Sequence, residues 1–149
     1  MKSKTVASWL ALVGGCLGLH RFYLHGFQDT WGWLFPVPTA MGVYGFERVS
    51  LYGLDDPLSW ILLPIFGLHV AICCLMAIWY GLMKPEEWNQ RYNPQAPANA
   101  MAGRSNWFTV FALIFSLMVG TAALLSGIAY GTQRYIEISI EQDAHKDLL

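Results

Sequence analysis

The chain has 149 residues, of which 55% are hydrophobic and only 13% are charged, and its formal net charge at pH 7 is −1. Together with a mean hydropathy of +0.38, this composition excludes an ordinary soluble domain. The balanced charge, with neither a basic excess nor an acidic tail, also argues against nucleic acid as a partner.

Four stretches without a charged residue divide the chain. They hold 16 residues after Lys4, 17 after Asp29, 27 after Asp56 and 29 after Arg104. A helix rises about 1.5 Å per residue and a bilayer core is about 30 Å thick, so the two long stretches can span it and the two short ones lie at the lower limit. This pattern predicts an all-α, polytopic integral membrane protein: a helical bundle of four, alternatively three, membrane segments with a short polar C-terminal tail.

The first apolar segment, residues 5–24, follows two lysines and therefore resembles the start of a secretory signal peptide. The letters VGGC, which end at Cys16, also resemble the site at which a bacterial lipoprotein is cut and lipidated. An uncleaved first helix fits better, because the run leads directly into more apolar sequence instead of a soluble domain. Within this helix, Gly14 and Gly18 have the four-residue spacing that lets two membrane helices approach closely.

The second apolar segment, residues 31–46, contains Pro36 and Pro38, which remove backbone hydrogen-bond donors and disfavour a straight helix. It predicts either a short kinked span or a helix that lies in the membrane interface. Residues 47–57 are predicted to form a polar turn. The first two segments together predict a helical hairpin within residues 1–50.

The third segment, residues 57–83, is a long predicted membrane helix. Pro57 suits its first turn, and the carboxylates of Asp55 and Asp56 suit its positive N-terminus. We expect a kink at Pro64.

Shorter elements are expected around the last span. A short surface helix at residues 85–92 completes the region 51–92, and residues 93–106, which are rich in prolines and small residues, predict a linker. Residues 132–149 form a polar tail. Its Tyr135–Ile140 part alternates as a β-strand would, although one such strand is too short to fold alone.

The fourth segment, residues 107–131, carries a continuous face of small residues. The members of this face follow one another at steps of four, four, three, four and four: Ala112, Ser116, Gly120, Ala123, Gly127 and Gly131. Because lipid gives helices little hydrophobic drive to associate, close packing of such a face supplies much of the association. We expect it to contact another helix, and the sequence leaves open whether that helix belongs to this chain, to a second copy or to another subunit.

The stretch GLHRFYLHG, residues 18–26, ends the first segment. On physical grounds the Arg21 guanidinium reaches the phosphate level of the headgroups, and Phe22 and Tyr23 lie at the interface. His20 is then a boundary residue able to hydrogen-bond. This interpretation needs no chemistry.

The same residues resemble the TM-two domain family of small membrane proteins. The motif is the glycine pair Gly15 and Gly18 followed by His-Arg-Phe-Tyr-Leu at residues 20–24, and the resemblance covers roughly residues 2–50. The chain departs from the family pattern in His25, which follows this motif, and in its second segment, which has prolines where the family has an acidic residue. The resemblance implies a hairpin of two membrane helices and no agreed catalytic activity. The layout after the hairpin resembles extended bacterial members, which implies the cytoplasmic (inner) membrane of a bacterium.

Basic residues orient the chain by a small margin. With four spans and a cytoplasmic N-terminus, five basic residues lie inside and four outside, and with three spans the count is again five to four. The positive-inside rule therefore favours a cytoplasmic N-terminus and leaves the side of the C-terminus open.

The two long spans contain no Asp, Glu, Lys or Arg, which argues against a proton relay or a charge-binding transporter. His69, Cys73 and Met76 share a helix face and offer nitrogen and sulfur ligands that suit a soft ion such as Cu(I). The alternative is a hydrogen-bonded histidine packed beside two space-filling residues. A haem held by His69 with His20 or His25 is a further alternative. We expect no catalytic residue, no cofactor and no metal.

These observations favour a non-catalytic membrane protein that acts through helix–helix contacts, as an accessory or assembly subunit or as a homo-oligomer. Its expected partners are membrane lipid and other membrane subunits or a second copy. Two alternatives stay open: a small-solute channel, and a metal- or haem-bearing membrane subunit.

Overall fold

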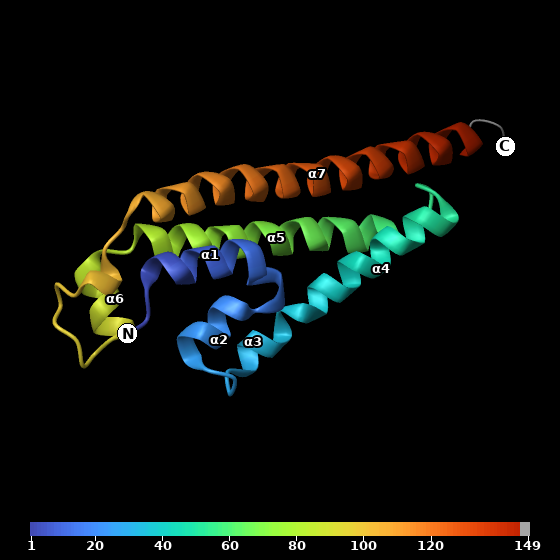
Figure 1. Ribbon diagram of the computed structural model, residues 1–149. Coiled ribbons are helices and arrows are strands. Elements are labelled where there is room, and N and C mark those ends of the chain that lie inside the picture. The colour runs from blue at the N-terminus through green and yellow to red at the C-terminus, as the bar shows by residue number, and fades with distance from the viewer. Residues whose placement is uncertain (147–149) are drawn as a thin grey trace.

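A computed structural model describes residues 1–146, which form helices and their connections without a β-strand. The elements in chain order are α1 (Lys4–Gly14), the 3₁₀ turn η1 (Gly15–Leu17), α2 (Leu19–His25), α3 (Thr30–Leu34), α4 (Pro36–Tyr52), α5 (Ser59–Leu82), α6 (Pro85–Tyr92), the 3₁₀ turn η2 (Met101–Gly103) and α7 (Trp107–Lys146). The expected all-α class is confirmed for these residues. Figure 1 shows α5 and α7 side by side as the long axis of the molecule.

Two helical segments are long and apolar enough to cross a membrane: α5, and the stretch Met101–Glu141, which includes most of α7. Only 39% and 22% of their most apolar windows are buried, whereas the core helix of a soluble protein would be mostly buried. The outward faces are rich in Leu, Ile and Phe, as lipid contact requires. The chain is therefore a membrane protein, but four membrane segments are not confirmed.

The small-residue face of α7 packs on α5 of the same chain. A Cβ placed on Gly120 would lie 2.8 Å from the Cβ of Cys74, and one placed on Gly67 would lie 2.6 Å from the carbonyl oxygen of Ala123. The Ser59 hydroxyl hydrogen-bonds Tyr130 at 2.9 Å near the other end of the contact. The two helices are therefore antiparallel, with their backbones in close approach along the shared length.

The first apolar segment is not one helix. At Gly18 the backbone adopts the left-handed conformation (φ 75°), and its N–H donates to the carbonyl oxygen of Gly15 at 2.8 Å. The chain then reverses, so that the N–H of Ser3 donates to the Tyr23 hydroxyl at 2.8 Å. We name residues 4–25 the re-entrant hairpin, because α1 and α2 enter and leave at the same end of the bundle. This corrects the expected single span over residues 5–24.

The second apolar segment is longer than the sequence pattern indicates. Helix α3 ends at Leu34, Pro36 begins α4, and this helix continues to Tyr52 through residues expected to form a polar turn. Helix α4 packs antiparallel on α5, where Gly42 lies against Phe66 and Gly45 lies against Leu62. Its last turn stays helical because Arg48 pairs with Asp56 across the connection to α5.

The chain thus passes along the bundle three times, through α3–α4, α5 and α7 (Figure 1). One end holds the N-terminus and α6, and we name it the α6 end. The other, where α4 turns into α5, is the far end.

Helix α6 occupies the expected residues, and it exposes Glu86, Glu87, Gln90 and Arg91 while one face is buried against the bundle. Trp88 is fully buried, and its indole N–H donates to the Lys2 carbonyl oxygen at 2.8 Å. The nearby Lys4 is also buried and donates from Nζ to the Met83 carbonyl oxygen at 2.8 Å. Burial lowers the pKa of Lys4, and the charge of Glu86 acts in the opposite direction. Helix α6 therefore packs against the N-terminal residues and covers this end of the bundle.

The polar tail is helical where the structure describes it. Helix α7 continues to Lys146, and the expected strand-like segment Tyr135–Ile140 lies within it. Hydrogen bonds from Gln133 and Arg134 to Glu137 support the helix one turn apart. The expected tail also includes residues 147–149, which lie outside the described residues.

The first prediction concerns the α5–α7 contact. Replacing Gly120→Leu should destabilise the folded chain itself, by about 1–3 kcal/mol or more, because the new side chain meets Cys74 of α5. The measurement is thermal unfolding of the purified protein in mild detergent. The matched control is Ala122→Leu on the exposed side of α7, which should unfold like the wild type. Equal unfolding of both variants would contradict this packing.

The second prediction concerns the Arg48–Asp56 pair. Asp56 accepts hydrogen bonds from Arg48 Nε at 2.8 Å and from the Ser59 N–H at 2.9 Å. The hydrogen bonds from Arg48 lower the pKa of Asp56 below its usual value of 3.8. Its ionised form therefore favours the folded state, and this contribution disappears as the pH falls through the folded-state pKa.

Replacing Asp56→Asn should lower the thermal unfolding midpoint at neutral pH, and the difference from wild type should shrink below pH 3.8. Asp55→Asn serves as the control, because the Asp55 side chain is 89% exposed and such pairs contribute little. If the unfolding midpoint of Asp56→Asn differed from that of the wild type by the same amount at every pH, the ionised Asp56 carboxylate would not stabilise the fold.

Candidate functional site

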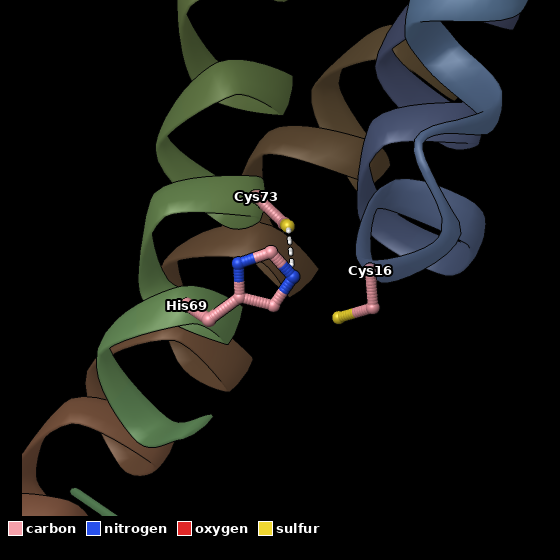
Figure 2. Close-up of side chains that lie close together, drawn as sticks. All are labelled: Cys16, His69 and Cys73. Carbon is pink, nitrogen blue, oxygen red and sulfur yellow. Dashed lines mark hydrogen bonds between the residues drawn. The ribbon is translucent and has the colours of Figure 1, made fainter. Parts of the chain in front are cut away.

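Three side chains with nitrogen or sulfur ligand atoms meet where the re-entrant hairpin touches α5. The His69 ring nitrogen Nε2 lies 4.0 Å from the Cys73 sulfur, and these atoms and the Cys16 sulfur all lie within 4.8 Å of one another. Figure 2 shows both sulfurs directed at the His69 ring, one from α5 and one from η1. We name Cys16, His69 and Cys73 the Cys–His cluster.

Local structure explains why these side chains converge. His69 and Cys73 are four residues apart on α5 and so share a helix face. Gly15 lets the turn come close, because a Cβ on it would lie only 2.8 Å from the Cβ of Cys73. The turn is held from the other side by the Thr39 hydroxyl, which donates to the Cys16 carbonyl oxygen at 2.7 Å.

The cluster lies near the middle of the membrane-crossing helix. Helix α5 has 24 residues and is about 36 Å long, and His69 and Cys73 flank its midpoint. Both are buried, whereas Cys16 is half-buried. Water is scarce at this depth, so a polar group gains most from a partner within the protein.

Sequence spacing identified two of the three members and missed Cys16. Met76, the expected third ligand, instead packs against the apolar core at the α6 end and lines a pocket with Arg21 and His25. Cys16 was not predicted to lie near His69, because the apolar pattern of residues 5–24 does not indicate that the chain turns back at mid-depth. Gly18 was the one local signal of that turn.

His20 lies near this site without joining it. It is fully buried, and within residues 1–146 neither ring nitrogen has a hydrogen-bond partner. The Phe35 ring lies 5.1 Å from the His20 ring and 5.5 Å from the His69 ring. Phe35 therefore fills the space between the two histidines, which disfavours a haem held by this pair, and His25 lies in a different pocket.

The other motif residues hold the re-entrant hairpin together. Arg21 forms an ion pair with Asp29, with Nε and Oδ2 2.6 Å apart, rather than extending freely to lipid phosphate as expected. The hydrogen bond from Arg21 lowers the pKa of Asp29. Phe22 stacks on Phe27 at 5.4 Å between ring centroids, and the Tyr23 hydroxyl accepts from the N-terminal backbone.

The residues predicted for helix packing fall into two groups. On α7, Ala112, Ser116, Gly120 and Gly127 are buried, and Ala123 and Gly131 are half-buried.

The glycines of the first segment serve the turn instead. Gly14 lies against Leu19 of the same hairpin, and Gly18 lies against the carbonyl oxygen of Gly32 in α3. No room for a Cβ remains at either position.

The pocket lined by Met76, Arg21 and His25 opens at the α6 end. It is lined by the cationic side chains of Arg21 and Arg91, by His25 and by the aromatic rings of Trp79 and Tyr92, among others. Basic groups beside aromatic rings at the end of a membrane helix suit contact with lipid headgroups. The arrangement can bind an anion, although Asp29 already neutralises Arg21.

Comparison with known proteins gives one finding. Residues 1–46 match the family model described as the TM2 domain, and this match covers the re-entrant hairpin, α3 and the first part of α4. Neither the curated proteins nor the solved structures yielded a match. The resemblance seen in the sequence is thereby confirmed for residues 1–46, which are similar to the TM2 domain, and together with the two long apolar helices it indicates a membrane protein.

Proposed function

We propose that this chain is a non-catalytic integral membrane protein that acts as an accessory or assembly subunit, or as a homo-oligomer, in the cytoplasmic membrane of a bacterium. The observation that carries this proposal is the length of α7. Its 40 residues make a helix of about 60 Å, twice the thickness of a bilayer core of about 30 Å. Part of the helix therefore extends into water.

We name residues 132–146 the stalk. The side chains of Tyr135, Ile136 and Ile140 on it are 73%, 50% and 62% exposed. Ile136 and Ile140 are one turn apart and form an apolar stripe on one side. A short helix in water is marginal without tertiary packing, and exposed apolar residues of this kind mark interaction surfaces.

The start of the stalk is tied to the bundle. Arg134 pairs with Asp55 of the α4–α5 connection, with Nη1 and Oδ1 2.8 Å apart, and also with Glu137. The stalk also continues the apolar part of α7 without a break, so its direction is set by that helix before the apolar stripe begins. A fixed, exposed stripe supports docking of a second helix in the aqueous phase.

The proposed contact differs from the one that the sequence suggested. Gly120 and Gly127 lie against α5 of the same chain, so the small-residue face is already occupied. Assembly through helix contacts then relies on the stalk and on the outward faces of α4 and α7. Lipid is the further expected partner, and the cationic pocket at the α6 end supports headgroup contact there.

The reversal in the re-entrant hairpin also changes the charge count. If α3–α4, α5 and α7 each cross the bilayer, six basic residues lie at the α6 end: Lys2, Lys4, Arg21, Lys84, Arg91 and Arg104. Only Arg48, Arg134 and Lys146 lie towards the far end. Six to three is a clearer bias than five to four, and it supports a cytoplasmic N-terminus with the stalk on the opposite side.

The third prediction tests this topology with single cysteines in a variant that lacks the three native ones. Gln28→Cys should react with a membrane-impermeant maleimide only after cells are permeabilised, because the re-entrant hairpin returns the chain to the cytoplasmic side. Ser105→Cys should behave in the same way.

Ser50→Cys and Ser139→Cys should react on intact cells. Labelling of Gln28→Cys together with Ser50→Cys would mean that the first segment crosses the membrane, and would overturn both the hairpin and the charge count.

The fourth prediction tests the stalk. Replacing both Ile136→Glu and Ile140→Glu should release the partner chain, because two carboxylates cannot be buried in an apolar helix contact without a large cost. The measurement is the protein mass of the gently extracted particle by light scattering, compared with 16.7 kDa for one chain. The conservative pair Ile136→Leu and Ile140→Leu should keep the wild-type mass. A wild-type particle of one chain, or a Glu variant of unchanged mass, would count against the proposal.

A further inference from the structure

The Cys–His cluster has the composition and spacing of a metal site. Around one ion with bonds of about 2.3 Å to sulfur and about 2.0 Å to nitrogen, donors at 120° lie about 3.7 Å apart. The Cys73 sulfur and His69 Nε2 are 4.0 Å apart, and all three donors lie within 4.8 Å. Side-chain movements of about an ångström or less would bring the donors to bonding distance.

We propose that Cys16, His69 and Cys73 bind one Cu(I) ion in three-coordinate geometry near the middle of the membrane. This inference goes beyond the proposed assembly function and does not depend on it. Thiolate sulfur is a soft ligand, which selects Cu(I) and Zn²⁺ over hard cations such as Mg²⁺ or Ca²⁺. The choice among metals therefore lies between these two.

The number of donors favours Cu(I). Zn²⁺ sites in proteins are almost always four-coordinate. Among residues 1–141, whose side chains the structure describes, the cluster offers three His, Cys, Asp or Glu donors and no fourth. The Phe35 ring packs on the His69 ring, at 5.5 Å between ring centroids, so an apolar side chain lies beside the cluster. Cu(I) is satisfied by three ligands.

Binding of Cu(I) displaces the protons of both thiols, because the thiolate and not the thiol is the metal ligand. Two protons leave for each ion bound, and the neutral imidazole binds through a nitrogen lone pair. The single positive charge of the ion then offsets one of the two thiolate charges, so neither thiolate stands without a cation beside it.

The backbone of the site is already ordered without the ion. His69 and Cys73 are buried on the continuous helix α5, whereas Cys16 is half-buried on the η1 turn. Its backbone is already held by Thr39, so binding orders little additional chain.

The experiment uses the full chain, purified in mild detergent without oxygen and with a phosphine reductant. The probe is Cu(I) supplied in competition with a chelator of known affinity. We expect one Cu(I) bound per chain, and an X-ray absorption spectrum with two sulfur ligands and one nitrogen ligand. Cys16→Ser, Cys73→Ser and His69→Phe should each weaken binding by about 100-fold or more, because even an outer partner of a metal ligand contributes 10- to 100-fold.

The neighbouring Cys74 provides a matched control. It is buried like Cys73, but it faces Gly120 of α7 instead of the turn. Cys74→Ser removes a buried thiol from the adjacent position of the same helix, and it should keep one tightly bound Cu(I). Equal loss of binding in Cys74→Ser and Cys73→Ser would overturn the assignment.

A measurement on the wild type keeps the proposal testable if a variant fails to fold. The redox-inert mimic Ag(I) should protect Cys16 from alkylation, as read by mass spectrometry of its peptide. Unchanged alkylation of Cys16 with Ag(I) would overturn the proposal. An X-ray absorption spectrum with four ligands would also overturn it. A Cys16–Cys73 disulfide in the isolated protein would do the same if the protein bound no Cu(I) after the disulfide had been reduced.

Discussion

Close approach of each long element to α5 is the interaction on which the rest of the structure depends. In lipid, apolar side chains gain little from leaving the solvent, so helices associate through tight van der Waals packing of their backbones. On α7, Gly120 meets Cys74 of α5, on α4 Gly42 meets Phe66, and at the η1 turn Gly15 meets Cys73. Each contact places a residue without a side chain against α5. Helix α5 is therefore the common support, and a larger residue at any of these glycines would push one element away from it.

The re-entrant hairpin must also satisfy its backbone at a depth where water is scarce. Irregular backbone in a bilayer is tolerated where protein buries it and supplies hydrogen bonds. Here the Gly18 N–H bonds to the Gly15 carbonyl oxygen, and the Thr39 hydroxyl bonds to that of Cys16. The Thr39 hydroxyl of α4 thus supplies a hydrogen bond to a backbone carbonyl oxygen at the break between α1 and α2. Because this hydrogen bond fixes the turn, the Cys16 side chain is held beside His69 instead of moving freely in lipid.

The sequence predicted the elements whose signal is local and repeated. The charge-free runs predict the ends of α5 and the start of α7, and Pro85 predicts the first residue of α6. The hairpin could not be predicted in this way, because hydropathy measures how apolar a segment is and not where its backbone reverses. The helical stalk was missed for a related reason: a six-residue alternation is weaker than the helix that already precedes it. Cys16 lies beside His69 only because the chain reverses after it. A prediction that lacked the reversal therefore could not include Cys16 in the candidate site.

The reversal gives the HRFY motif of the TM2 domain a different meaning from a membrane boundary. Tyr23 is bound by the Ser3 N–H, Arg21 by Asp29, and Phe22 lies against Gly32. Each of these contacts joins α2 to a neighbouring segment, so the motif holds α2, the returning helix of the hairpin, in place. The same contacts keep the Arg21 charge on the side of the N-terminal lysines and hold η1 at the midpoint of α5. One local structure therefore sets both the distribution of basic residues between the two ends of the bundle and the position of the half-buried Cys16 thiol.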